Sequence, residues 1–195
     1  MASILVVYAT KEGQTEKIAR RITDTLRHEG HTVDLVDTDH PRVVPEHGRF
    51  QAVFVGAPIH AGGYPRSVLR FVRTHHALLE RVPSAFFSVG LAVASRTSDG
   101  RAQTLPLVEK FVEQTGWRPR RVELLAGALL YSKYNFLVRF VMRRISAKEG
   151  GDTDTTRDYE YTDWQAVDRF ALDFVRESTG ERSVDPATTV HAASA

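Results

Sequence analysis

The sequence predicts an α/β fold, in which a parallel sheet of five strands is covered by helices on both faces. Short apolar runs alternate along the chain with segments whose apolar residues recur at helical spacing. The apolar runs are nearly continuous, which is typical of strands buried on both faces of a parallel sheet. With 195 residues, 42% hydrophobic and 26% charged, the chain has the size and composition of one globular domain.

The predicted elements follow one another in regular order. Strands are predicted at 4–8, 32–36, 52–56, 84–89 and 122–126. Helices are predicted at 13–29, from Pro65 through Leu79, at 105–115 and at 162–177. The first helix stops before a glycine, as many helices do, and the spacing of Thr162 and Gln165 is that of a capping box. Strands that alternate with helices in this way form one parallel sheet.

The connection between the fifth strand and the last helix breaks this alternation, because it is longer than most connections in compact domains. We predict a helix over 130–148 and a loop over 150–154, and we interpret 130–154 as a helical insertion after strand five. From residue 178 the chain is rich in Ser, Thr and Ala without periodicity, which indicates a disordered tail over 178–195. The folded domain is therefore expected to span 1–177.

Composition excludes several classes of chemistry. The chain has no cysteine, so it forms no disulfide, iron–sulfur cluster, cysteine-ligated zinc site or thiol nucleophile. The spacing of its histidines indicates no metal site, and there is no Gly-x-Ser-x-Gly motif of a hydrolase. The first residues lack a basic stretch before their apolar run, and no apolar run approaches the ~18 residues of a membrane span. We therefore expect a cytoplasmic protein.

The loop after the first strand has the composition of a phosphate-binding loop. In parallel sheets ligands bind outside the carboxyl ends of the strands. There, backbone N–H groups, the helix dipole and two hydroxyls can surround an anion. The candidate residues are Thr10, Lys11, Glu12, Gly13, Gln14 and Thr15. The pattern is neither a P-loop nor a Gly-x-Gly-x-x-Gly dinucleotide loop, and a plain strand-to-helix turn is the alternative.

Two further loops at the same edge are suited to a flat ring. Glycine and proline after the third strand let backbone approach a planar ligand closely, and Tyr64 or His60 could stack on it. The candidate residues are Pro58, Ile59, His60, Ala61 and Gly62 from the second loop, and Ser88, Val89, Gly90 and Leu91 from the third. A flat ring with a phosphate tail indicates flavin mononucleotide (FMN), while turn-rich connections are the alternative. His60 is the candidate catalytic residue, for proton handling.

Residues 7–15 resemble the phosphate-loop signature of the flavodoxin superfamily. More closely, the chain resembles the bacterial menaquinone-dependent protoporphyrinogen IX dehydrogenases. The matching segments are 10–15, 83–89, 117–119, 126–129, 150–155 and 161–164. This resemblance implies a flavodoxin-like three-layer sandwich with strand order 2-1-3-4-5 and bound FMN. It also implies oxidation of protoporphyrinogen IX or a related reduced tetrapyrrole, with electrons passed to a quinone such as menaquinone.

The chain departs from that family near the expected flavin. Residues 58–64 read Pro-Ile-His-Ala-Gly-Gly-Tyr, where the family has Ser-Ile-Arg-Tyr-Gly-His-Tyr. Gly90 replaces an asparagine, and Leu130 replaces an arginine. Two cations that could pair with tetrapyrrole carboxylates are thus absent. An NAD(P)H-linked quinone reductase and a flavodoxin-type electron carrier without its own substrate remain alternatives.

The formal net charge of +2 conceals a strong separation of charge. Residues 117–148 carry +7, which leaves −5 for the rest of the chain. Within this segment Leu137, Val141 and Ile145 share one predicted helical row, with Phe136 and Phe140 beside it. A basic amphipathic helix of this kind predicts peripheral membrane contact through 131–148. Packing on the body or on a second subunit, in a homo-oligomer, is the alternative, and no nucleic-acid motif accompanies the charge.

Overall fold

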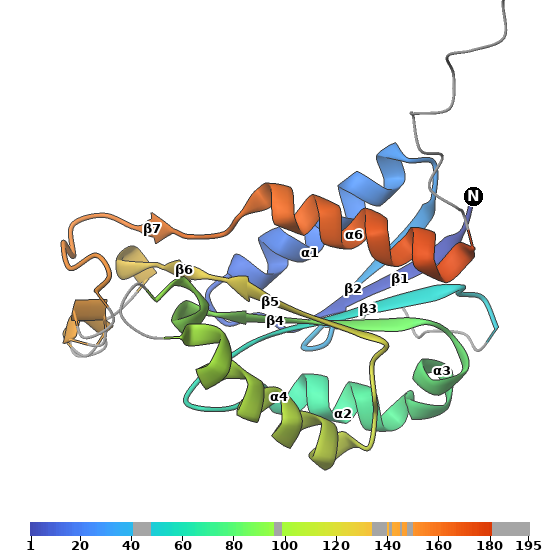
Figure 1. The fold of residues 1–195 in the computed structure, drawn as a ribbon, viewed down its shortest axis with the longest axis horizontal. Helices are drawn as coiled ribbons and strands as arrows, with labels where there is room; N and C mark the ends of the chain where they lie inside the picture. Colours follow the sequence, from blue (N-terminus) through green and yellow to red (C-terminus); the bar gives the residue numbers. More distant parts are fainter. Residues whose placement is uncertain are drawn as a thin grey trace, which may run out of the picture.

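The computed structural model describes residues 1–40, 48–95, 99–133, 140, 142–144, 146–147 and 150–180. Its centre is a five-stranded sheet in which every neighbouring pair is parallel (Figure 1). The order is β2-β1-β3-β4-β5, which confirms the predicted α/β class and strand order. The strands are β1 (Ser3–Tyr8), β2 (Thr32–Asp37), β3 (Ala52–Pro58), β4 (Ser84–Gly90) and β5 (Arg121–Ala126).

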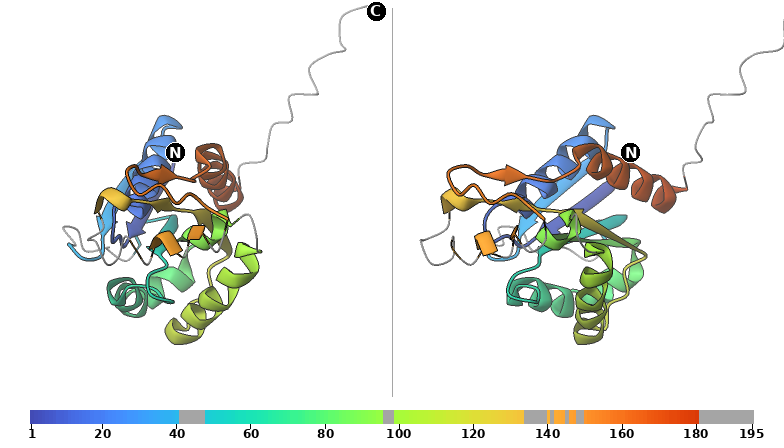
Figure 2. Two further views of the ribbon diagram at one scale, coloured as in Figure 1. Left: turned by 90° about the vertical axis from the view of Figure 1, so that its left-hand side faces the viewer. Right: turned by 60° about the vertical axis from the view of Figure 1, so that its left-hand side comes forward.

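Two groups of helices cover the faces of the sheet and complete three layers (Figures 1 and 2). One face is covered by α1 (Gln14–His28) and α6 (Trp164–Thr179), and the other by α2 (Arg66–Thr74), α3 (His76–Arg81) and α4 (Gly100–Thr115). Phe54 packs edge-on against two phenylalanines of α6 in the first core. Phe86 stacks on Phe111 of α4 in the second. β1, β3 and β4 are buried on both faces, as their continuous apolar runs predict, whereas the edge strands β2 and β5 are partly exposed.

Two of the predicted helices differ in the structure. The single helix predicted after Pro65 is two, α2 and α3, with His75 between them. α4 begins at Gly100 because Asp99 caps it by accepting a hydrogen bond from the Ala102 N–H (3.0 Å), so Pro106 lies inside the helix. No apolar period marks that first turn, which is why sequence reasoning started the helix too late.

The capping box predicted for the last helix is wrong. Asp163 caps α6 by accepting from the Ala166 N–H (3.0 Å). The Thr162 hydroxyl instead donates to the carbonyl of Ala126 (2.8 Å), and so ties the start of α6 to the end of β5. α6 continues to Thr179, two residues into the predicted tail, and residues 181–195 lie outside the described residues.

The segment after β5 extends beyond the carboxyl ends of the strands (Figure 1). It contains a two-stranded antiparallel sheet of β6 (Ala128–Leu129) and β7 (Tyr159–Glu160), and a 3-10 turn, η2 (Tyr131–Lys133). Strands of two residues carry no readable period, so they were not predicted. Residues 140, 142–144 and 146–147 are helical, in line with part of the predicted helix, whereas its apolar residues 136, 137, 141 and 145 lie outside the described residues. No helix in the described part of the chain is long and apolar enough to cross a membrane.

Candidate functional site

A cavity of about 530 Å³ opens at the carboxyl ends of β1, β3 and β4. This volume lies in the usual range for small-molecule and cofactor sites. The loops after these three strands supply most of the wall. Its lining residues are Thr10, Lys11, Glu12, Gln14, Thr15, Pro58, Ile59, His60, Ala61, Gly62, Val89, Gly90, Leu91, Ala92, Gly127, Ala128 and Met142.

The loop between β1 and α1 turns tightly to aim the first turn of α1 at the cavity. Gly13 adopts φ +98°, a conformation that favours glycine, and its N–H donates to the Thr10 hydroxyl oxygen (3.0 Å). The carbonyl of Gly13 accepts the first helical hydrogen bond, from the Lys17 N–H (3.0 Å). Unpaired backbone N–H groups at such a helix start attract anions.

Two buried side chains in this loop have polar atoms without a hydrogen-bond partner among the described residues. They are the hydroxyl of Thr15, a residue that is 1% exposed, and Oε1 of Gln14, a residue that is 6% exposed. The other end of the Gln14 amide donates to the Thr162 hydroxyl (2.9 Å), so that side chain is held in place. A buried unpaired hydroxyl destabilises a protein unless a ligand satisfies it. Both the free Thr15 hydroxyl and the helix start therefore fit a phosphate group.

The loop after β3 forms a tight hairpin at the rim of the cavity. His60 and Gly63 exchange two backbone hydrogen bonds (2.9 and 3.1 Å). Between them Ala61 and Gly62 adopt φ +49° and +74°. Such a turn suits glycine, and an alanine with positive φ is strained by roughly 1 kcal/mol. The preceding residue, Ile59, is tied to β4 by its N–H, which donates to the carbonyl of Val89 (2.8 Å). The turn is thus held firmly where backbone can approach a flat ligand.

The loop after β4 is also closely packed. A Cβ on Gly90 would lie 3.0 Å from the Cδ1 atom of Ile59, tighter than ordinary contacts. The Gly90 carbonyl accepts from the Gly127 N–H (3.2 Å), so the loops after β4 and β5 meet at this point. Gly90 therefore fills a position where a side chain would displace the loop after β3.

The cavity brings together all the predicted site residues except Gly13 and Ser88. Gly13 forms the turn between β1 and α1 without lining the cavity. Ser88 is fully buried, and its hydroxyl lies 2.7 Å from the hydroxyl of Tyr64. Tyr64, which could have stacked on a ring, instead packs edge-on against Phe86 and Phe111, and burial raises its pKa to about 12. Side chains alternate along a strand, so Ser88 faces this core rather than the cavity.

Sequence reasoning missed four lining residues, Ala92, Gly127, Ala128 and Met142. The first three are small and carry no functional group, so only their place beside a strand end could have indicated them. Met142 comes from the segment after β5, far along the chain from the three loops. Its presence shows that this segment forms one wall of the cavity. Among the described residues, no group of three His, Cys, Asp or Glu side chains could hold a metal ion.

Two aspartates organise the segment that forms this wall. The carbonyl of Asp152 accepts from the hydroxyls of Tyr131 (3.1 Å) and Ser146 (2.7 Å). Its carboxylate accepts from the Tyr161 hydroxyl (2.8 Å), and burial together with this bond raises the pKa of Tyr161 to about 12. Asp158 accepts from the N–H and the hydroxyl of Ser132 (2.8 and 2.5 Å), and these bonds lower the pKa of its carboxyl group.

Comparisons with known proteins by family, by sequence and by structure agree with one another. The chain matches the family described as "Flavodoxin domain" over residues 5–156. It is 37% identical to a Leishmania major protein named "Protoporphyrinogen IX dehydrogenase [quinone]", over 87% of this chain and 73% of the relative. It is 36% identical to a protein of the same name from Escherichia coli K12, over 86% and 91%. An archaeal flavodoxin structure superposes with a TM-score of 0.51 at 14% identity, covering 91% of this chain and 99% of that chain, which supports the fold.

Proposed function

Since this chain belongs to the flavodoxin domain family, we propose that it is an FMN-dependent oxidoreductase that oxidises protoporphyrinogen IX or a related reduced tetrapyrrole and passes the electrons to a quinone. The observation that carries this proposal is identity of 36–37% over most of the chain to two proteins named for that reaction. FMN is the cofactor that a flavodoxin domain implies. The cavity at the strand ends supports it, because the start of α1 and the unpartnered Thr15 hydroxyl are suited to a phosphate and small residues line the loops after β3 and β4.

In this proposal different residues of the cavity bind the phosphate and the ring of the cofactor. The start of α1 and the hydroxyls of Thr10 and Thr15 bind the phosphate. The hairpin of residues 60–63 and the loop of residues 90–92 flank the ring, where small residues let backbone come close. FMN supplies the electron-accepting chemistry, and the protein supplies position and environment.

Oxidation of the substrate releases protons together with electrons, and a histidine at the exposed rim of the cavity could accept a proton. His60 is exposed at the cavity edge, and imidazole takes up protons near neutral pH. We propose that a ring nitrogen of His60 accepts a proton from the reduced tetrapyrrole. Leu130 stands where the family has an arginine. It is only 8% exposed, so its side chain is packed into the protein.

Anaerobic reduction of the FMN-loaded protein tests the reaction. Protoporphyrinogen IX is expected to bleach the visible flavin bands, and a menaquinone analogue is expected to restore them. Faster bleaching by NADH or NADPH would instead favour a nicotinamide-linked quinone reductase. Bleaching by neither compound would favour an electron carrier. The variant His60→Gln tests the proton transfer. Because His60 also lines the cavity, its FMN Kd is measured in parallel, and reduction by protoporphyrinogen IX is expected to slow by a larger factor than FMN binding weakens.

We also propose that the basic segment contacts an anionic membrane surface, where a quinone would be reached. Phe140 is 55% exposed, and exposed Arg143 and Arg144 lie near it in the sequence. Such pairing of aromatic and basic side chains favours the interface of an anionic bilayer. The variant Phe140→Ser is expected to weaken binding to vesicles of anionic phospholipid, whereas Leu105→Ser, a matched change on α4 of a residue 47% exposed, is not. If Phe140→Ser and Leu105→Ser bind the vesicles equally well, the result would favour a contact of the basic segment with a second subunit instead.

A further inference from the structure

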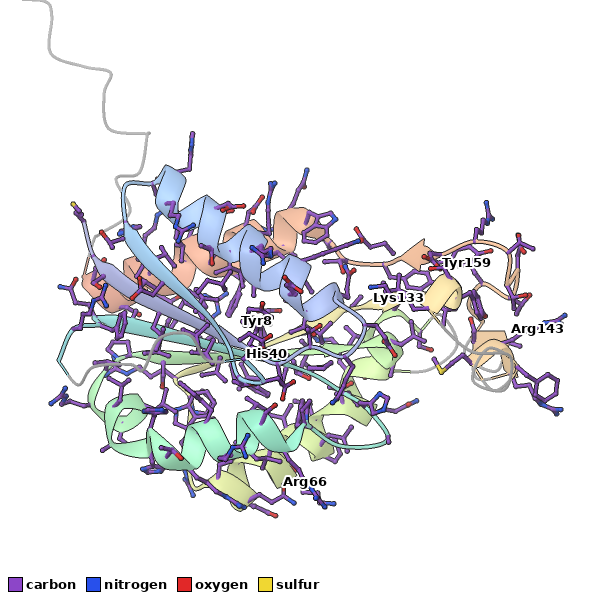
Figure 3. The ribbon with its side chains drawn as sticks, turned by 180° about the vertical axis from the view of Figure 1, so that it is seen from behind. Tyr8, His40, Arg66, Lys133, Arg143 and Tyr159 are labelled. Carbon is purple, nitrogen blue, oxygen red and sulfur yellow. The ribbon has the colours of Figure 1, made fainter. Side chains whose placement is uncertain are left out.

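A lysine from the segment after β5 reaches the phosphate loop from outside. Lys133 ends η2, more than a hundred residues along the chain from the loop, yet its ammonium donates to the carbonyl of Glu12. The same ammonium lies 3.3 Å from the point at which a Cβ on Gly13 would stand. Figure 3 shows Lys133 on the side of η2 that faces the first turn of α1. A positive charge is thus held against the turn that aims α1 at the cavity.

The other cations on the first turns of α1 are already paired. Lys17 forms an ion pair with Glu160 (3.0 Å), and Arg20 forms one with Glu16 (2.8 Å). Within the described part of the chain, Lys133 makes no ion pair, and its ammonium donates to a neutral carbonyl. No carboxylate among the described residues is therefore in direct contact to cancel its charge, which acts on any anion bound at the loop.

The backbone around Lys133 is held in place by its two neighbours in η2. Tyr131 is fully buried, and its hydroxyl donates to the carbonyl of Asp152. Ser132 donates twice to the carboxylate of Asp158. A lysine carried by an ordered turn loses less conformational entropy when it binds an anion than one on a free loop.

We propose that the charge of Lys133, placed on the outer side of the loop between β1 and α1, stabilises the bound phosphate group of FMN and so couples the segment after β5 to the cofactor. This inference rests on the FMN site of the proposed function. The unpaired Thr15 hydroxyl points independently to an anion on the same loop. The formal charges of Lys11 and Glu12 cancel, so the side chains of the loop carry no net charge. Lys133 therefore adds a net positive charge beside the loop, and it favours FMN over flavins without a phosphate.

Titration with two flavins tests this proposal, because riboflavin has the ring and ribityl chain of FMN but no phosphate. In Lys133→Met, quenching of flavin fluorescence is expected to give an FMN Kd higher by on the order of tenfold, because one positive charge near the phosphate is lost. The riboflavin Kd is expected to stay within about twofold. Lys133→Arg keeps the charge and is expected to recover most of the FMN affinity. Lys110→Met, on exposed α4, is the matched control and is expected to change neither value.

The outcomes separate this inference from the cofactor assignment. An unchanged FMN Kd in Lys133→Met, or an equal loss for FMN and riboflavin, would overturn the role of Lys133 and leave the proposed FMN site standing. A wild-type protein that binds neither flavin would overturn both. A loss confined to FMN would support both. In that case raising the ionic strength should weaken FMN binding more in the wild type than in Lys133→Met, since the charge of Lys133 is missing from the variant.

Discussion

The two walls of the cavity are held by different forces. The wall formed by the loops after β1, β3 and β4 stands on strands whose side chains are almost all buried. The opposite wall belongs to the segment after β5, in which polar contacts of Asp152 and Asp158 are prominent. Apolar burial is cooperative across the whole domain, whereas a few polar contacts near solvent can open locally. The first wall should therefore open only when the whole domain unfolds, and the second should open while the rest of the domain stays folded.

The largest expected effect is on the sheet side. Phe54 is fully buried between β3 and α6, with its ring 5.5 Å from Phe170 and 4.9 Å from Phe174. We expect Phe54→Ala to lower the free energy of unfolding by about 3–5 kcal/mol, because it leaves a cavity in the core. Urea unfolding measures this value. Leu105→Ala, on an exposed part of α4, is the control and should change it by less than about 0.5 kcal/mol. A loss under about 1 kcal/mol in Phe54→Ala would contradict a tightly packed core.

A smaller and local effect is expected in the opposite wall. Asp158→Ala removes both bonds that hold Ser132. We expect the Ser132 amide to exchange its hydrogen on the order of tenfold faster, while exchange in β1 and the global free energy of unfolding stay nearly constant. Hydrogen exchange followed by NMR or mass spectrometry measures both regions. The variant Asp24→Ala, which changes an exposed aspartate of α1, should alter neither. Faster exchange throughout the sheet would show that the two walls open together.

The smallest effect concerns the contact between α1 and α6. Arg21 donates to both oxygens of Asp168 (2.8 and 2.6 Å) and thereby lowers the pKa of that carboxyl group. A carboxyl whose folded pKa is depressed stabilises the fold above its unfolded pKa, and this contribution is lost as the pH falls through the folded value. Since the pair is partly exposed, we expect Asp168→Asn to cost roughly 0.5 kcal/mol at pH 7. The difference from wild type should shrink toward pH 3, and a constant difference would assign the cost to packing instead.

The fold was predictable because its strands are buried on both faces. Runs such as residues 4–8 and 52–56 have no polar interruption that would suit a half-exposed strand, and they predict a parallel sheet directly. The cap of α6 was not predictable, since Thr162 and Asp163 are both good capping residues and only the contact of Thr162 with the end of β5 decides between them. Tertiary contacts of this kind carry no periodic signal.

The site was predictable where it depends on loops next to strands. Residues 10–15 and 58–62 lie at strand ends, so topology alone brings most of them to the cavity. The prediction that Ser88 belongs to the site was wrong, because a residue inside a strand faces one side of the sheet or the other. Here Ser88 faces Tyr64 and not the cavity. Lys133 and Met142 could not be assigned, because the contact of Lys133 with Glu12 and the place of Met142 in the cavity lining depend on how a long connection folds back.

The hydroxyl of Thr15 offers the most direct test of the FMN site, since it is buried and unpaired within the described structure. Thr15→Val keeps the shape of the side chain and removes the hydroxyl. We expect the free energy of unfolding without flavin to stay the same or rise slightly, because an unsatisfied buried polar group is lost. In a titration with FMN, the account predicts binding of one FMN per wild-type chain and a Kd on the order of tenfold higher for Thr15→Val. Equal FMN affinity in the two proteins, or a wild-type protein that takes up no FMN, would contradict it.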